Sequence, residues 1–224
     1  TLLAFVAIGT SWAAEGKTPT LHLVRDGMPA ATIVLAKDAT LSAQLAAAEL
    51  QYHVRKITGA TLPIADDGQT IANNRVLVRE SPATQNLGLK SDDFAPQEYL
   101  IRFLPGTLVL MGRDRPDRGR LDYAEVKTFP AFSGEQATCY AVYDFLERCA
   151  QVRWYLPTEL GLCCPTAKTL QVSGDEIRRR PAMGYRHCHI IETLFSADLC
   201  GDTVEGPKPA PPLPLREQLL FAMR

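Results

Sequence analysis

The sequence predicts an α/β fold in which helices pack on a mixed sheet. Two stretches have helical periodicity, at 41–57 and 133–149, and short apolar runs of strand length lie around them. Strands and helices that alternate loosely, with hairpins between, are typical of this class. The 224 residues, 46% apolar and 22% charged, are enough for one ordinary globular domain with an additional segment.

Residues 1–14 are predicted to be the remnant of a secretory signal. An apolar run at Leu2–Ile8 precedes small residues, and Ser11 and Ala13 fit the positions before a cleavage site. The alternative is a buried strand or helix at the terminus. The run is too short to span a bilayer, and no later stretch qualifies. We therefore expect an exported protein, periplasmic or extracellular, with no membrane span.

The first predicted elements are a hairpin and a helix. Leu21–Val24 and Thr32–Leu35 are apolar runs on either side of the turn pair Asp26-Gly27, which indicates two paired strands. Thr40 then offers an N-cap for a helix over 41–57, and Gly59 is a typical left-handed stop.

This helix carries two apolar stripes. The first consists of Ala43, Ala47, Leu50, Val54 and Ile57, and the second of Leu41, Leu45, Ala48 and Tyr52. At 100° per residue the two stripes lie nearly opposite each other. The pattern predicts a helix packed between two layers. One layer is the sheet, and we expect the other to be a body that this chain does not fully contain.

The middle of the chain is predicted to add a strand, a hairpin and a loop. Arg75–Arg79 has strand character, and alternating residues at Glu98–Phe103 precede a return strand at Thr107–Met111 after the turn Pro105-Gly106. Residues 112–132 lack periodicity and are rich in charge, which indicates a long loop.

The second helix is predicted to begin at Ser133, with Gln136 completing a capping box, and to run to Cys149. Strand-like pieces follow at Val152–Tyr155 and Thr169–Val172. After Arg180 the character changes. Residues 183–191 resemble a strand, residues 206–214 are rich in proline, and residues 215–224 look helical.

No complete catalytic motif is present. Tandem carboxylates occur at Asp66-Asp67 and Asp92-Asp93, beside glycine or serine in loops, where such pairs are usually solvated, so we assign them no catalytic role. The net charge of −1 gives no electrostatic reason to expect nucleic acid as a partner.

The triplet His187-Cys188-His189 contains metal-ligating residue types, but not at a spacing typical of zinc sites. In a strand the two histidines share a face, where they can line a pocket, and Cys188 points away. We predict no metal and no cofactor. A metal-dependent enzyme that uses His187 and His189 remains an alternative.

Five pieces of the chain together resemble the N-terminal α/β domain that precedes the catalytic barrel of bacterial β-N-acetylhexosaminidases and α-glucuronidases. The resemblance covers about residues 20–186 and is carried by the order and spacing of the pieces, which also occur in uncharacterised exported proteins with this domain before a barrel. The pieces are Ala48–Pro63 with its Thr-Gly-Ala-Thr-Leu-Pro exit, the pair Glu98–Ile101 and Leu108–Gly112, Tyr140–Glu147, Val152–Pro157 and Arg180–Arg186.

The resemblance implies a largely antiparallel sheet flanked by two helices and packed on a TIM-like barrel. It makes 18–180 the accessory domain and 181–224 the truncated start of the barrel, with a proline-rich insertion. In hexosaminidases the arginine on the first barrel strand binds sugar hydroxyls, and Arg186 is the matching position. We predict that Arg186 and the adjacent His187 bind the sugar, although hexosaminidases usually have glycine in place of His187. The acid/base carboxylates of both families lie deeper in the barrel, so we expect them beyond Arg224.

The resemblance therefore predicts a non-catalytic domain of an exported glycoside hydrolase-like protein that acts in polysaccharide or glycoconjugate breakdown. Its partners are the downstream barrel of the same polypeptide and the carbohydrate substrate. The alternative is a non-enzymatic carbohydrate-binding or cell-surface module. Such a module needs an exposed aromatic platform, for which Trp154 and Tyr155 are the candidates.

Overall fold

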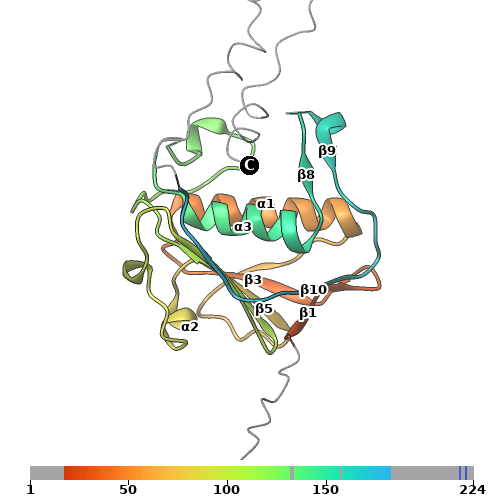
Figure 1. Cartoon of the computed structure of the whole chain (residues 1–224), viewed down its shortest axis with the longest axis horizontal. Coiled ribbons are helices and arrows are strands. Elements are labelled where there is room, and N and C mark those ends of the chain that lie inside the picture. Colours follow the sequence, from red (N-terminus) through yellow and green to blue (C-terminus); the bar gives the residue numbers. More distant parts are fainter. Residues whose placement is uncertain (1–17, 132–133, 157, 183–216, 218–219, 221–224) are drawn as a thin grey trace, which may run out of the picture.

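The computed structural model describes residues 18–131, 134–156, 158–182, 217 and 220. It shows helices α1 (Leu41–Thr58) and α3 (Ala137–Cys149) side by side across one face of a sheet (Figure 1). The predicted α/β class with a mixed sheet is confirmed. The predicted signal, the strand at 183–191, the proline-rich stretch and the start of a barrel lie outside the described residues, apart from Glu217 and Leu220, which are helical.

The central sheet has six strands in the order β11-β6-β7-β5-β3-β4. Their bounds are β3 Ala31–Leu35, β4 Ile64–Asp66, β5 Asn74–Val78, β6 Tyr99–Leu104, β7 Thr107–Gly112 and β11 Ile177–Arg179. The pairs that join β7, β5, β3 and β4 are parallel, and those that join β11, β6 and β7 are antiparallel. The hairpin predicted around Pro105-Gly106 is β6–β7.

Two smaller antiparallel sheets complete the described strands. One has the order β10-β1-β2, formed by Leu170–Ser173, Thr20–Arg25 and Met28–Pro29, and the other pairs β8 (Arg153–Trp154) with β9 (Leu162–Cys163). Four further short elements are described: α2 at Pro82–Gln85 and single helical turns at Ser91–Asp93, Val126–Thr128 and Glu159–Gly161. The described helices include none that is both long enough and apolar enough to cross a bilayer.

The predicted pairing of the first two apolar runs is wrong. Asp26 and Gly27 do form a tight turn, with φ angles of 49° and 78°, but it joins β1 to the two-residue strand β2. The run at 32–35 belongs to β3, which leaves that sheet and lies parallel between β4 and β5. Ala31 to Val34 are all buried, as expected for a strand covered on both faces, so interior burial outweighs the local hairpin.

Helix α1 begins and ends as predicted. The Thr40 hydroxyl accepts a hydrogen bond from the Ala43 N–H at 3.2 Å, which satisfies one of the free donors of the first turn. Gly59 adopts a φ of 77°, and its N–H donates to the Arg55 carbonyl at 2.8 Å. A left-handed residue at this position lets the chain turn away from the helix axis.

Helix α3 begins later than predicted. It starts at Ala137, and Gln136 occupies the capping position instead of the third helical position. The Gln136 side chain donates to the Ala131 carbonyl at 2.7 Å, and Ser133 lies outside the described residues. One of the free N–H groups in the first turn of α3 has Asp114 as its partner: the carboxylate accepts a hydrogen bond from the Thr138 N–H at 2.8 Å. A tertiary partner thus replaces the local capping box.

Apolar residues fill both faces of the central sheet. The larger cluster lies between the sheet and the two helices, and a smaller one lies on the far face against the segment that contains α2. Gly112 permits the close approach of β7 to α3, because a Cβ there would lie 2.5 Å from the Ala137 Cβ and 2.6 Å from the Glu98 carbonyl oxygen. The helix layer is therefore seated directly on β7.

Asp114 joins both helices to the sheet. Its side chain is fully buried and accepts from the hydroxyls of Thr138 at 2.6 Å and Thr40 at 3.4 Å, and the Arg79 Nε lies 3.6 Å away. Burial raises its pKa from 3.8 to about 6, and the hydrogen bonds from Thr138 oppose that rise. The folded state thus holds a proton on this carboxyl that the unfolded chain releases at lower pH.

We expect Asp114→Asn to remove one pH dependence of stability. Because the folded pKa lies above the unfolded one, the contribution of Asp114 is complete below pH 3.8 and is lost as the pH rises through about 6. The free energy of unfolding of the variant, relative to the parent, should rise by up to about 3 kcal/mol between pH 4 and 7. Urea unfolding at several pH values measures it. A difference that stays constant with pH, as expected for the exposed control Asp92→Asn, contradicts this assignment.

Candidate functional site

The face of α1 turned away from the sheet is covered by later parts of the same chain. Leu45 is fully buried, and the Tyr52 ring lies 6.3 Å from the ring of Tyr123. Leu41 lies beside Gly119. The prediction of a helix packed between two layers holds. The expectation that the second layer comes from outside the chain is wrong for Leu45, which is already buried within the described residues. The loop around Tyr123 and the β8–β9 hairpin contact the outer side of α1 at Glu49 and His53.

Two polar side chains are buried between α1 and this outer layer. Glu49 and His53 are both fully buried. The Tyr123 hydroxyl donates to the Glu49 carboxylate, and the Trp154 Nε1–H donates to His53 Nε2 at 3.0 Å. His53 Nδ1 lies 2.7 Å from the Glu49 carbonyl oxygen, which can only accept. These two bonds require a neutral imidazole with its proton on Nδ1. The cluster fastens the outer layer to the helix.

Trp154 belongs to this cluster and not to an exposed platform. Its ring is half-buried and meets the rings of His53 and Tyr143 edge to face, at 5.3 and 5.8 Å between centroids. Of the two aromatic candidates for a sugar-binding platform, only Tyr155 stays exposed, at 68%. The two neighbours therefore have different roles.

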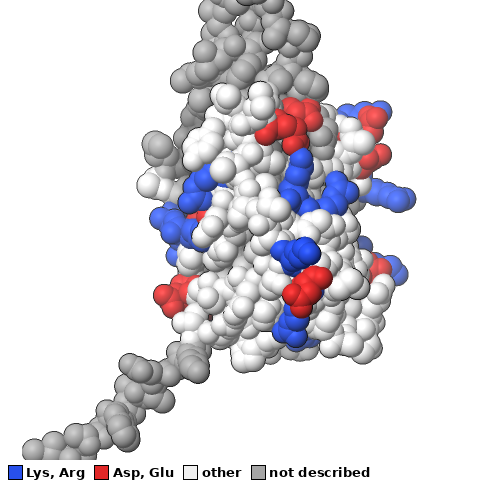
Figure 2. Space-filling view, turned by 90° about the vertical axis from the view of Figure 1, so that its right-hand side faces the viewer, with Lys and Arg blue, Asp and Glu red and all other residues white. Residues whose placement is uncertain are grey.

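The tip of the β8–β9 hairpin presents apolar side chains to the outside. Tyr155, Leu156 and Leu160 are 68%, 54% and 97% exposed. Figure 1 shows this hairpin standing away from the helix layer. On the face turned toward the viewer in Figure 2, which is the side of β9 and β10, acidic and basic side chains lie next to each other and neither sign forms a continuous patch.

The hairpin tip is held in place. The Tyr155 N–H donates to the Gly161 carbonyl at 2.8 Å, and a Cβ at Gly161 would lie 2.4 Å from the Leu156 nitrogen, so only glycine fits there. Glu159 accepts from the Tyr52 hydroxyl at 2.9 Å and pairs with Lys56, whose pKa it raises. Two residues of α1 thereby anchor the tip, which makes it a fixed apolar surface.

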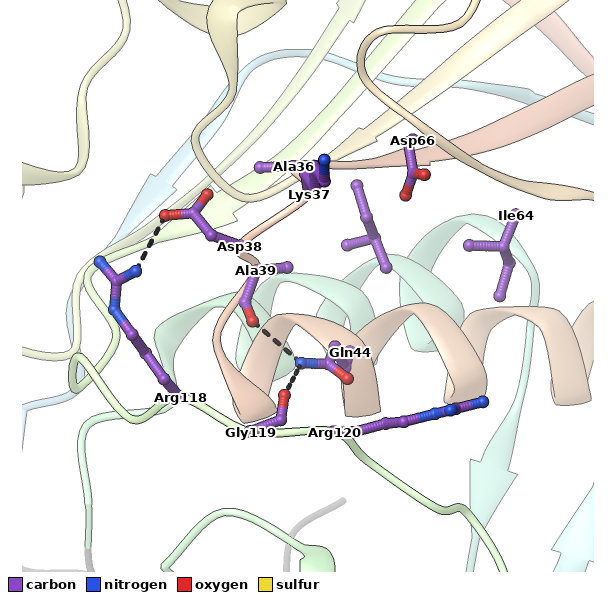
Figure 3. A pocket seen from close by; sticks show the side chains of 11 residues that line it. Ala36, Lys37, Asp38, Ala39, Gln44, Ile64, Asp66, Arg118, Gly119 and Arg120 are labelled. Carbon is purple, nitrogen blue, oxygen red and sulfur yellow. Dashed lines mark hydrogen bonds and ion pairs between the residues drawn. The ribbon is translucent and has the colours of Figure 1, made fainter.

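A cavity of about 340 Å³ lies at the other end of α1, beside the carboxyl ends of β3 and β4 (Figure 3). Lys37, Asp38, Asp66, Arg118 and Arg120 are its charged lining residues. In the sequence, Asp66 is apparent only as part of a tandem carboxylate. The cavity could not be predicted, because Lys37 and Arg120 come from segments some eighty positions apart that no local pattern links.

The remaining predicted residues are placed as follows. Arg186, His187 and His189 lie outside the described residues, so the predicted sugar-binding pair and the alternative histidine site stay predictions. Asp92 and Asp93 lie in a single helical turn, where the Asp93 carboxylate accepts from the Lys90 N–H at 3.2 Å. The described part of the chain contains no group of three or more His, Cys, Asp or Glu residues arranged to hold a metal.

No known protein family matches the chain, and no curated protein matches it. Among solved structures, the chain is similar to a family GH115 4-O-methyl-α-glucuronidase with specificity for decorated arabinogalactans. The sequence identity is 16% and the TM-score is 0.46, over 75% of this chain and 19% of that chain. The chain thus spans about a fifth of that protein.

We expect Trp154→Phe to destabilise the domain by about 1–3 kcal/mol, because it leaves the buried Nε2 of His53 without its donor. The matched control is Tyr155→Phe, which changes an exposed neighbour and should alter the free energy of unfolding by less than about 0.5 kcal/mol. Chemical denaturation of the three proteins measures both effects. Equal stabilities for the two variants would show that the Trp154–His53 bond does not hold the outer layer.

Proposed function

We propose that this chain is a non-catalytic accessory domain of an exported glycoside hydrolase-like protein that acts in polysaccharide or glycoconjugate breakdown. Its role is to brace the catalytic barrel of the same polypeptide. The structural observation that carries the proposal is the fixed apolar tip of the β8–β9 hairpin. The export part rests on the sequence, on the apolar run Leu2–Ile8 followed by small residues.

The pieces that carry the sequence resemblance occupy the parts of the fold that this role needs. Ala48–Pro63 forms the second half of α1 and its exit, and Tyr140–Glu147 forms most of α3. The described part of Val152–Pro157, residues 152–156, forms β8 and the start of the hairpin tip. The resemblance therefore includes the helix layer and the surface that projects from it.

Exposed side chains at the tip favour contact with another body. Large apolar groups that cluster on a surface commonly mark an interaction site, whereas single ones need no explanation. Leu156 and Leu160 are both more than half exposed at one tip, on a backbone that their own segment fixes. A rigid apolar projection loses little conformational entropy when it is buried. Contact with a second domain is the role that suits this geometry.

The position of Leu220 supports a neighbour from the same polypeptide. This residue is 3% exposed and is part of the main core, together with residues of α1 and α3. Leu220 therefore packs in the same core as the two helices. A domain that follows in the sequence would begin close to this one. Because the two would be covalently linked, the following domain would be present at a high effective concentration near the hairpin tip.

The buried carboxylates of the domain serve the fold. Glycosidic cleavage requires two carboxyl groups that reach a sugar from either side of the scissile bond. Glu49 and Asp114 have completely buried side chains, and each already accepts hydrogen bonds from neighbouring hydroxyls. These two groups hold helices and loops together, which suits an accessory domain.

The second candidate is a non-enzymatic carbohydrate-binding or cell-surface module. The exposed ring of Tyr155 favours it, since aromatic rings can stack on sugar faces. Glycan-array binding by the chain that Tyr155→Ala abolishes without unfolding would support this module. Binding that Tyr155→Ala leaves unchanged would remove the observation on which it depends.

We expect Leu160→Asp to loosen the contact with the following domain. In the polypeptide extended past Arg224, the change places a charge in an apolar interface, so limited proteolysis between the two domains should become faster. Unfolding of the 224-residue chain alone should be unaffected, because Leu160 is 97% exposed there. The matched control is Leu87→Asp, at an exposed position in the segment that contains α2.

Three results would contradict the proposed role. The first is equal proteolysis of the Leu160→Asp and Leu87→Asp proteins. The second is a coding sequence in which no catalytic domain follows Arg224. The third is hydrolysis of aryl glycosides by the 224-residue chain itself.

A further inference from the structure

We infer that the cavity beside the ends of β3 and β4 is a binding site for a small hydroxylated carboxylate, such as a sugar acid. It lies at the amino end of α1, whereas the hairpin tip is anchored to the carboxyl half of that helix through Tyr52 and Lys56. The inference does not depend on the bracing role, because the two surfaces share no residue.

The topology creates the cavity. Strands β3 and β4 are parallel, with Leu35 opposite Asp66, so their carboxyl ends lie at one edge of the sheet. The chain then turns through residues 36–39 into α1, and the segment around Gly119 crosses in front. Ligands in α/β sheets usually bind outside the carboxyl ends of the strands, which is the side on which this cavity lies.

Hydrogen bonds fix the walls. The Gln44 side-chain amide donates to the carbonyls of Ala39 and Gly119, both at 2.9 Å, and its oxygen accepts from the Leu121 N–H at 3.0 Å. Asp117 accepts from the Leu41 N–H at 3.1 Å. The crossing segment is therefore joined to the first turn of α1 at several points. Asp117 and Thr40 accept from the N–H groups of Leu41 and Ala43 in that turn, so we expect a ligand to be recognised by side chains.

The charges in the cavity leave two cations and one anion available. Arg118 pairs with Asp38 at 3.2 Å, which neutralises both. Within the described residues, the side chains of Lys37, Arg120 and Asp66 form no ion pair or hydrogen bond. Figure 3 shows Asp66 and Ile64 along one wall, at the end of β4, and Arg120 extended along α1 on the other side.

This arrangement suits an anion that also carries hydroxyl groups. An arginine and a lysine attract a carboxylate, and arginine can bind it through two parallel hydrogen bonds. The Asp66 carboxylate can only accept, so it requires donors, which sugar hydroxyls supply. It also repels a second negative charge, which disfavours a phosphate dianion. The side chain of Ile64, 43% exposed, offers an apolar wall for a C–H face, and a cavity of about 340 Å³ suits one sugar unit.

Titration calorimetry of the 224-residue chain with sodium D-glucuronate tests the inference. We expect saturable binding, and affinities for D-glucose, sodium acetate and sodium phosphate at least about tenfold weaker, since each lacks one of the two recognised features or adds repulsion from Asp66. Arg120→Gln and Lys37→Gln should each weaken glucuronate by about tenfold. Asp66→Asn should reduce the preference for glucuronate over acetate.

Lys168→Gln is the matched control, because it removes the same charge beside the Asp26-Gly27 turn, where the Lys168 carbonyl accepts from the Gly27 N–H. It should leave the affinity unchanged. Absence of saturable glucuronate binding, equal affinities of Arg120→Gln and Lys168→Gln, or tighter binding of phosphate would each overturn the inference. Leu160→Asp should bind glucuronate normally, so failure of the bracing role and failure of this site are distinguishable.

Discussion

The arrangement of the domain depends on one buried carboxylate. Asp114 follows β7 and holds the first turn of α3 through Thr138 and the cap of α1 through Thr40, while Arg79 approaches from the end of β5. Both helices are thereby fixed with their amino ends at the same edge of the sheet. The outer layer and the cavity both contact these helices, so their positions depend on the hydrogen bonds of Asp114. Burying the Asp114 carboxylate costs desolvation energy, and this desolvation is the main cause of its raised pKa.

Local signals in the sequence predicted the fold where local chemistry decides it. Thr40 and Gly59 act within one turn of the helix they bound, and both predictions are confirmed. The prediction failed where a distant partner decides the structure. The run at 32–35 pairs with β4 and β5 and not with its neighbour along the chain. Gln136 lies at the N-cap of α3 and not inside the first turn, and Asp114 from another segment accepts the hydrogen bond from the Thr138 N–H. A sequence alone does not reveal such competition.

The candidate functional surfaces were harder to predict from the sequence, because they too depend on contacts between distant segments. Trp154 and Tyr155 are both aromatic, and only the contact with His53 separates a core residue from an exposed one. Glu49 and His53 lie one turn apart on α1, between the two apolar stripes, and could have been suspected as a buried polar pair once that helix was expected to be covered on both sides. The cavity combines residues near Lys37 with residues near Arg120, and no spacing rule connects them.

Helix α1 links the two proposed surfaces mechanically. It has 18 residues and is about 27 Å long, with the cavity at its amino end and the anchored hairpin along its carboxyl half. A continuous helix between two layers does not bend easily, so the distance between the surfaces is fixed. Under both proposals, this helix therefore sets the distance between the hairpin tip and the cavity.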